Sequence, residues 1–380
     1  MALTNLGFPK GARPRVAYLM SGLGRTQRGA EALTLDLIGP LRHFVDLTVF
    51  GAAELGQQVR ALPMVPRNAR WLEQLTATLP ASASRILRRL HLTPVGVEML
   101  TFMLSAQPAL WAGHYDAWLV ATGSWGCLLA SLYRRLTGTP FLVLGHGGYW
   151  GELDNARFHP DLHLFVNTDV RDAVVRKIPG LRSAVIPNGI DLTRFSPPSL
   201  LSGSPRPLPR CRILSVGALE PGKRLDLTLQ AVALIPTASL VICGTGPEAS
   251  RLQELGTRLL GPQRFSLTSA DRSAMPELYR ACDVFTLAST EETCGMVYLE
   301  ALACGKPVVA PDDATRRFVV GDAGILLPDI ANPARYAAAL TRALQGPLAL
   351  APRVQAERFN IQQTATQYAA AIHTVVGERG

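Results

Sequence analysis

Residues 284–310, VFTLASTEETCGMVYLEALACGKPVVA, contain an apolar strand, a polar loop, a helix and a second apolar strand in immediate succession. The first strand covers 284–287, the helix opens near Gly295, and Gly305 with Pro307 supplies the punctuation that ends a helix. This order of elements is typical of parallel sheets, whose strands are connected through helices packed on the sheet. The stretch therefore predicts an α/β fold, and the sequence on either side shows the same alternation.

Short runs rich in Val, Leu and Phe alternate with amphipathic segments in both halves of the chain. The strands expected in the first half are Arg15 to Met20, Asp46 to Phe50, Ala117 to Ala121, Phe141 to Leu144 and Ala184 to Ile186. Those expected in the second half are Cys211 to Val216, Ser239 to Cys243, Arg264 to Thr268, Asp283 to Leu287 and Pro307 to Ala310. We expect two Rossmann-like, doubly wound parallel sheets facing a central cleft, with ligands at the carboxyl ends of the strands.

A proline-rich segment separates the two halves. Residues 196–210, SPPSLLSGSPRPLPR, contain five prolines and no periodicity, so we place a linker at 199–210. The first domain is then expected at 1–198 and the second at 211–359. A chain of 380 residues has a suitable length for two domains.

Composition restricts the classes of function. Apolar residues make up 48% and charged residues 18%, which excludes extensive disorder, and the net charge of +9 indicates an anionic partner. Nucleic acid is not expected, because no interleaving of aromatic and basic residues is present. No secretory signal is visible in residues 1–11, and the apolar run 117–133 is broken by glycine and serine, so we expect a cytoplasmic protein without a membrane span.

Cysteines give no sign of a metal site or of disulfides. The six cysteines are scattered, without a C-x-x-C pair or a Cys/His cluster, at positions 127, 211, 243, 282, 294 and 304. Free thiols in a reducing compartment are therefore expected. No Asp-x-Asp occurs in the chain either. We therefore expect no metal cofactor, and expect side-chain cations and helix ends to neutralise any diphosphate.

A basic segment interrupts the pattern of the first half. Residues 57–97 carry six arginines against Glu73 alone, and an apolar stretch, 99–111, follows. One interpretation is an amphipathic helical insertion that contacts anionic lipid at the inner membrane face. The alternative is a solvated helical face that covers one sheet.

Two glutamates flank the start of the helix near Gly295. Glu292 precedes the helix, and Glu300 lies on its second turn among apolar residues. The free N–H groups of Cys294, Gly295 and Met296 form an anion site at the helix N-terminus. Carboxylates beside such a site suit a ligand that also carries hydroxyls, such as a sugar and a ribose joined by diphosphate. The alternative makes Glu292 a plain loop residue and Glu300 a surface residue.

Other strand ends carry glycines and cations. Gly217 follows a strand and precedes the pair Lys223 and Arg224, an order that delivers cations to a phosphate. The stretch 241–248, VICGTGPE, lets backbone approach a ligand or simply forms a tight turn, and it lacks the third glycine of a dinucleotide fingerprint.

The first half has two such loops. Residues 21–31, SGLGRTQRGAE, include Gly29, and residues 144–151, LGHGGYWG, place His146 among glycines. A histidine there could hydrogen-bond a sugar hydroxyl or transfer a proton; the alternative is a purely structural histidine.

Together these motifs resemble family 4 of the retaining glycosyltransferases, within glycosyl transferases group 1. The resemblance rests on 186–197 (IPNGIDLTRFSP), the Gly217 to Lys223 loop, VICGTGPE, and the glutamate pair with CGMVYLEALACGKPVVA. It is ordered across 187–359, weaker over 15–185, and absent from the basic segment. It implies a hexosyltransferase of GT-B fold with a nucleotide sugar as partner, and an acceptor (a glycan, a lipid-linked molecule or a small molecule) selected by the first domain.

The resemblance also implies roles for single residues. Glu300 would bind the donor ribose. Glu292, with the backbone of 294–296, would bind the transferred sugar and its phosphate. Lys223 would stabilise the leaving diphosphate. His146 would contact the sugar near the reacting carbon. We thus expect His146, Lys223 and Glu292 to be the catalytic residues.

Further implied features are structural. Gly29 would offer backbone to the diphosphate, the segment 268–272 would face the base, and a helix at about 360–380 would return to the first domain. The family often has an arginine after the strand glycine where this chain has Ala218. Arg224, Arg25 and Arg28 are candidate replacements.

Other activities of the fold stay open at this point. A nucleotide-sugar epimerase or hydrolase would use the same donor without an acceptor. A non-catalytic nucleotide-sugar or membrane-binding module would not need both glutamates and Lys223.

Overall fold

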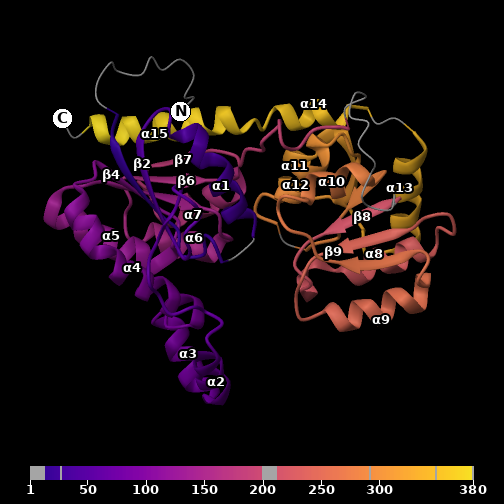
Figure 1. Ribbon diagram of the computed structural model, residues 1–380, viewed down its shortest axis with the longest axis horizontal. Helices are drawn as coiled ribbons and strands as arrows, with labels where there is room; N and C mark the ends of the chain where they lie inside the picture. Colours follow the sequence, from indigo (N-terminus) through magenta and orange to yellow (C-terminus); the bar gives the residue numbers. More distant parts are fainter. Residues whose placement is uncertain (1–12, 26–27, 199–211, 291, 347–348, 379–380) are drawn as a thin grey trace. The chain divides into compact units, whose positions relative to one another are not determined.

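The computed structural model describes residues 13–25, 28–198, 212–290, 292–346 and 349–378, with the side chains at 73, 76, 77, 81, 84 and 88 left out. The chain divides into two compact units (Figure 1). The first unit contains Met1–Pro187 and Gln362–Gly380, and the second contains Asn188–Ile361. Each unit is built on one parallel sheet, as the alternation of strands and helices predicted.

The first unit has a seven-stranded sheet in the order β3-β2-β1-β4-β5-β6-β7. Its strands are β1 (Arg15–Leu19), β2 (Asp46–Gly51), β3 (Arg60–Ala61), β4 (Ala117–Val120), β5 (Phe141–Gly145), β6 (Leu162–Phe165) and β7 (Ser183–Val185). Its helices are α1 (Gly29–Leu41), α2 (Arg70–Thr78), α3 (Ala81–Arg89), α4 (Pro94–Gly113), α5 (Gly123–Thr137), α6 (Tyr149–Ala156), α7 (Thr168–Lys177) and α15 (Ile361–Gly377). The predicted strands are confirmed, and β3 and β6 were not predicted.

The second unit has a six-stranded sheet in the order β10-β9-β8-β11-β12-β13. Its strands are β8 (Ile213–Val216), β9 (Leu240–Cys243), β10 (Phe265–Thr268), β11 (Val284–Thr286), β12 (Val308–Pro311) and β13 (Gly324–Leu327). Its helices are α8 (Leu225–Ala233), α9 (Ala249–Leu260), α10 (Met275–Ala281), α11 (Met296–Ala303), α12 (Ala314–Val319), α13 (Pro333–Gln345) and α14 (Pro352–Glu357), with short 3-10 turns η1 (Pro221–Lys223) and η2 (Gly321–Ala323). Only β13 had not been predicted.

Residues 188–198 belong to the second unit, whereas the sequence had placed them in the first domain. Arg353 explains the difference, because its guanidinium donates to the carbonyls of Leu192 (2.9 Å) and Phe195 (2.7 Å). Ile190 also forms a parallel bridge with Asn360. These contacts fix the segment to the second unit before the proline-rich stretch begins. The predicted linker, 199–210, lies outside the described residues.

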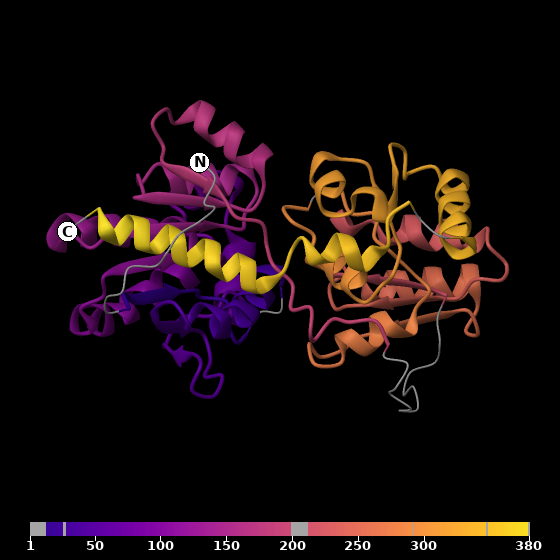
Figure 2. The same cartoon turned by 90° about the horizontal axis from the view of Figure 1, so that it is seen from above.

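Helix α15 belongs to the first unit, although it follows the second unit in sequence (Figure 2). Tyr368 and Ile372 on this helix are fully buried. The Thr364 hydroxyl donates to the Pro187 carbonyl (3.3 Å), and Arg182 pairs with Glu378 at 2.6 Å. The first unit is therefore completed by the end of the chain.

The basic segment folds into helices. Helix α4 packs on α5 and α2 packs on α4, whereas Figure 1 shows α2 and α3 projecting away from the sheet. On these two helices Trp71 and Ile86 are 56% and 58% exposed, next to the exposed arginines Arg70, Arg85 and Arg89. The alternative of a face that covers a sheet fits α4 and does not fit α3. Within the described residues, no helix combines the length and the apolar character that crossing a bilayer requires.

Candidate functional site

The anion site was predicted in the loop between β11 and α11. Helix α11 begins at Met296, and its N-cap, Gly295, has φ +68°. A Cβ at Gly295 would lie 2.5 Å from the Tyr298 ring, so both the backbone conformation and the packing require glycine. The predicted helix start and its glycine are confirmed, and the first N–H groups of α11 have no helical partner.

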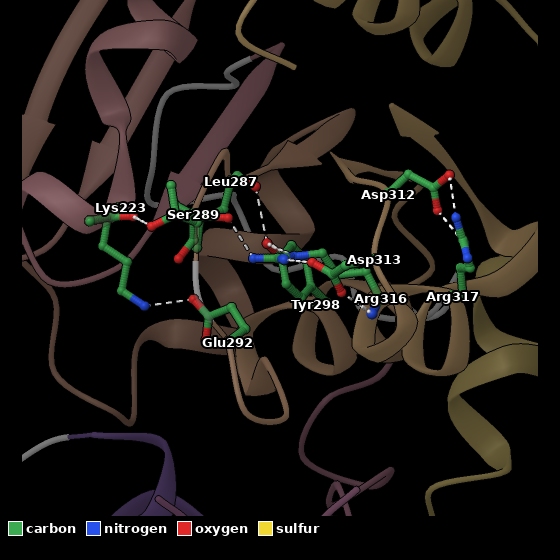
Figure 3. Close-up of polar contacts among 11 residues, drawn as sticks. Lys223, Leu287, Ser289, Glu292, Tyr298, Asp312, Asp313, Arg316 and Arg317 are labelled. Carbon is green, nitrogen blue, oxygen red and sulfur yellow. Dashed lines mark hydrogen bonds and ion pairs between the residues drawn. The ribbon is translucent and has the colours of Figure 1, made fainter. Parts of the chain in front are cut away.

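Lys223, at the end of the turn η1, and Glu292, in the loop between β11 and α11, form an ion pair. The Lys223 Nζ donates to Glu292 Oε1 at 2.6 Å, and Figure 3 shows the two side chains pointing toward each other from different elements. Both are largely buried, at 24% and 13% exposure. The Thr290 N–H donates to the Gly222 carbonyl (3.0 Å) and joins the same two loops by their backbones. A predicted cation and a predicted carboxylate thus lie at one place.

Glu300 is buried within the second turn of α11, with 7% exposure, so the alternative of a surface residue is wrong. The Tyr279 hydroxyl from α10 donates to Glu300 Oε2 at 2.7 Å. Burial, and then the nearby Glu300 charge, raise the pKa of Tyr279 well above its usual value. Tyr279 therefore remains a donor at all ordinary pH values and orients the carboxylate.

The first unit holds His146 in the loop after β5. Burial lowers the pKa of His146 to about 4, against the opposing charge of Glu152. The Glu152 carboxylate accepts from the Gly147 N–H (2.6 Å) and lies 2.9 Å from His163 Nε2. A Cβ at Gly147 would lie 2.7 Å from Glu152 Oε1, so the glycine makes room for this buried carboxylate. His146 is therefore a neutral imidazole on a fixed loop.

Residues 203–362 match the family model described as glycosyl transferases group 1. The second unit is a group 1 glycosyltransferase domain. A D-inositol 3-phosphate glycosyltransferase from Acidothermus cellulolyticus is 34% identical over 190 residues, 43% of this chain and 40% of that protein. A phosphatidyl-myo-inositol mannosyltransferase from Mycolicibacterium smegmatis is 37% identical over 157 residues, 39% of this chain and 40% of that protein. The chain thus spans about two fifths of the length of these curated relatives.

The whole chain has the GT-B fold. Sucrose-phosphate synthase from Thermosynechococcus elongatus superposes with a TM-score of 0.76 at 17% identity, covering 96% of this chain and 100% of that one. HepE from Anabaena, in complex with UDP and glucose, superposes with a TM-score of 0.70 at 18% identity, covering 94% of this chain and 99% of that one. The expectation of two Rossmann-like parallel-sheet domains is confirmed.

Within the group 1 domain, the loop glycines have packing roles. A Cβ at Gly244 would lie 1.9 Å from the Gly217 carbonyl oxygen, and one at Gly246 would lie 2.5 Å from that of Leu219. The glycines of VICGTGPE therefore bring the loop after β9 onto the loop after β8. Gly217 itself has room for a side chain, and its N–H donates to the Cys243 carbonyl (3.1 Å).

Among the candidate replacements for an arginine at position 218, Arg224 is the nearest in sequence to Ala218. Arg224 has a left-handed backbone (φ +49°), and its Nε lies 3.9 Å from Asp226. This candidate replacement for the missing arginine is thus the N-cap of α8 and lies next to an acidic residue in the first turn of that helix. The segment predicted to face the base, 268–272, follows β10, where the Thr268 carbonyl accepts from the Gly244 N–H (2.9 Å).

Cys294, the residue before the N-cap of α11, is buried. Burial raises the pKa of its thiol to about 12, against the effect of hydrogen bonds with Asn188. The thiol is therefore neutral and unreactive. The described cysteines are all buried, namely Cys127, Cys243, Cys282, Cys294 and Cys304.

The predicted site residues divide between the two units. Gly217, Lys223, Glu292, Cys294, Gly295, Met296 and Glu300 belong to the second unit, and Gly29, the first residue of α1, and His146 belong to the first. Sequence reasoning missed three residues that support the site: Tyr279, Tyr298 and Arg316. For Tyr298 the available signal was an aromatic residue inside the apolar helix α11, whereas Arg316 lies on α12, ATRRFV, and gave no such signal. Over the described residues, no cluster of three or more His, Cys, Asp or Glu is arranged to hold a metal ion.

Proposed function

We propose that this chain is a retaining hexosyltransferase that takes a sugar from a nucleoside-diphosphate donor. The observation that carries the proposal is the Lys223–Glu292 pair at 2.6 Å beside the free N–H groups of α11, with Glu300 buried on the same helix. Relatives named as glycosyltransferases support the reaction class, and UDP and glucose in HepE support the donor class.

Each group of the second unit suits one part of such a donor. Glu300, oriented by Tyr279, would accept hydrogen bonds from the two ribose hydroxyls. Glu292 would bind sugar hydroxyls, and the N–H groups of Gly295 and Met296 would bind the diphosphate. Lys223 would stabilise the charge that develops on the departing diphosphate, a type of contact worth about 10²–10³ in rate. We propose that Lys223 and the N–H groups at the start of α11 balance the charge of the diphosphate without a metal ion.

The transfer would proceed on one face of the sugar. The bond between the anomeric carbon and the phosphate oxygen breaks, the acceptor oxygen bonds to that carbon, and the acceptor proton passes to the leaving phosphate. His146, neutral because its pKa is about 4, would hydrogen-bond a sugar hydroxyl near the reacting carbon. The chain's part is to orient the donor and to hold the leaving group.

The helices α2 and α3 favour an acceptor at an anionic membrane surface. Exposed Trp71, Ile86 and Leu90 lie among exposed arginines, a composition that inserts apolar side chains between anionic headgroups. The relative from Mycolicibacterium is named for an inositol phospholipid, which supports this acceptor class. We therefore propose a phospholipid or lipid-linked acceptor, bound through the first unit.

A panel of nucleotide sugars tests the proposed function. Release of nucleoside diphosphate would be measured with vesicles containing phosphatidylinositol, with free inositol phosphate, and without acceptor. We expect one donor to be used, and a glycosylated product to appear in equal amount to the nucleoside diphosphate. Turnover without a glycosylated product would favour an epimerase or hydrolase. Unchanged donor affinity in Glu300→Ala would reject the assigned site.

A further inference from the structure

A buried guanidinium lies behind the loop that carries Glu292. Arg316, on the short helix α12, is 1% exposed and is among the largest fully buried side chains of the described residues. Its neighbour Arg317 is 64% exposed and pairs with Asp312 at the surface. Figure 3 shows Arg316 directed toward Tyr298 and Ser289, and Arg317 directed away from them.

The contacts of Arg316 converge on the start of the donor loop. Its Nη2 donates to the Ser289 carbonyl (2.6 Å), and its Nε donates to the Tyr298 hydroxyl (3.2 Å). The same hydroxyl donates to the Leu287 carbonyl (3.0 Å), and the guanidinium lies 5.7 Å from the centroid of the Tyr298 ring. Two backbone carbonyls of the loop are thus held by one arginine and one tyrosine.

Asp313 balances the charge of Arg316. One oxygen of Asp313 accepts from the Arg316 N–H (2.9 Å) as the cap of α12, and the other pairs with Nη1 of the guanidinium. If position 316 only had to fill space in the core, an apolar side chain would serve as well or better, because burial of a charge costs desolvation free energy. The hydrogen bonds of Arg316 therefore indicate that this position requires donors aimed at particular acceptors, and not only a side chain of a particular volume.

The loop is also held from its other side. The Thr290 N–H donates to the Gly222 carbonyl (3.0 Å), next to Lys223. Ser289 and Thr290 are consecutive, so Arg316 and Gly222 hold adjacent residues from opposite directions. Glu292 lies two positions after Thr290, and it pairs with Lys223, the residue after Gly222.

We propose that Arg316, acting through Tyr298 and the Ser289 carbonyl, is a positioning residue that sets Glu292 and the start of α11 for the donor. This inference rests on the proposed function for the role of Glu292, and it concerns residues that do not themselves touch the donor. Removal of the guanidinium would release the loop and weaken donor binding, whereas chemistry on donor already bound would change less.

Four variants test the proposal: Arg316→Met, Arg316→Lys, Tyr298→Phe, and Arg317→Met as the matched control. Amide hydrogen exchange of peptides covering 287–296 reads the loop without any substrate. We expect at least tenfold faster exchange confined to this segment in Arg316→Met, a smaller change in Tyr298→Phe, partial rescue in Arg316→Lys, and no change in Arg317→Met. With the donor found from the nucleotide-sugar panel, KM should rise about tenfold in Arg316→Met, with a smaller change in kcat.

The proposal would be overturned if Arg316→Met showed the same amide exchange rates and the same KM as Arg317→Met. Should Arg316→Met not fold, Tyr298→Phe carries the same comparison, because it removes only the hydroxyl that joins Arg316 to Leu287. A wild-type chain that uses no nucleotide sugar would reject the proposed function alone, since the exchange experiment still reports whether Arg316 holds the loop.

Discussion

The Lys223 ammonium lies 2.6 Å from the Glu292 carboxylate, although the two residues are 69 positions apart in sequence. Each charge is largely removed from water, and each is compensated by the other. An incoming diphosphate would share the lysine with the glutamate, so the cation is already placed before the donor arrives. Such preorganisation removes part of the cost of orienting charges during the reaction.

Replacement of Lys223 by methionine should mainly slow the chemical step. We expect kcat to fall about 10²–10³-fold, because the leaving diphosphate loses its cation. Arg258→Met, which removes an exposed cation from α9, is the control and should leave kcat unchanged. The measurement is the initial rate of nucleoside diphosphate release. A loss confined to KM would contradict the assigned role of Lys223.

Substitution of Glu300 should weaken donor binding. Hydrogen bonds to a charged acceptor contribute about 1.5–3 kcal/mol, so Glu300→Ala should raise the donor dissociation constant about 10–100-fold. Glu300→Gln keeps an oxygen for the Tyr279 hydroxyl and should preserve thermal stability while still lowering affinity. Calorimetric titration with the donor gives the affinity, and unaltered binding by both variants would reject ribose recognition.

His146 should make stability depend on pH. Its pKa is about 4 in the folded chain and about 6.5 when unfolded, so the unfolded state binds more protons between these values. The folded state is therefore fully favoured above pH 6.5 and loses stability as pH falls toward 4, by at most about 1.4 kcal/mol per pH unit. Urea midpoints of the wild type and of His146→Gln should diverge over this window. If the urea midpoints of the two proteins changed in parallel with pH, the lowered pKa of His146 would be contradicted.

Gly147 and Gly148 form a natural matched pair. Gly147→Ala would place a methyl group 2.7 Å from Glu152 Oε1, whereas a Cβ at Gly148 meets nothing within 4 Å. Overpacking of a buried site typically costs about 1–3 kcal/mol, so Gly147→Ala should lower the urea midpoint clearly and Gly148→Ala should not. Equal midpoints would show that Glu152 moves away at little cost.

The arginines of α3 should contribute to membrane binding. Each basic residue near an anionic surface contributes about 1 kcal/mol, so Arg85→Ser with Arg89→Ser should weaken binding to vesicles rich in anionic lipid about thirtyfold. The control, Arg258→Ser with Arg342→Ser, removes two exposed charges from the second unit. Vesicle flotation at low and high salt measures the effect. Equal loss in both double variants would indicate that net charge, rather than this surface, drives binding.

The sequence predicted most of the strands that are apolar runs, although it missed β13, whose residues are GILL. It failed for β6, because a polar residue, His163, stands inside a strand of four residues. The structure explains this residue: His163 is fully buried, bonds to Glu152 and stacks on Phe165 at 4.1 Å. Similarly, β3 has only two residues and carries no periodic signal.

The site was predictable where a single residue broke a local pattern. Glu300 stood out as an acid in an apolar helix, and Gly295 as a glycine at a helix start. Arg316 did not stand out, because its meaning depends on the Ser289 carbonyl and on Tyr298, which the sequence places 27 and 18 positions away. Contacts of this kind arise only when separate elements pack.

The return of α15 to the first unit has a practical consequence for dissecting the molecule. A fragment ending at Pro187 would lack α15, whose Tyr368 and Ile372 are buried in the first unit, and it would expose to solvent the apolar side chains that pack against them. Such a fragment should aggregate on expression. An isolated amino-terminal half would have to be spliced, with residues 362–378 joined back by a short loop or supplied as a separate peptide.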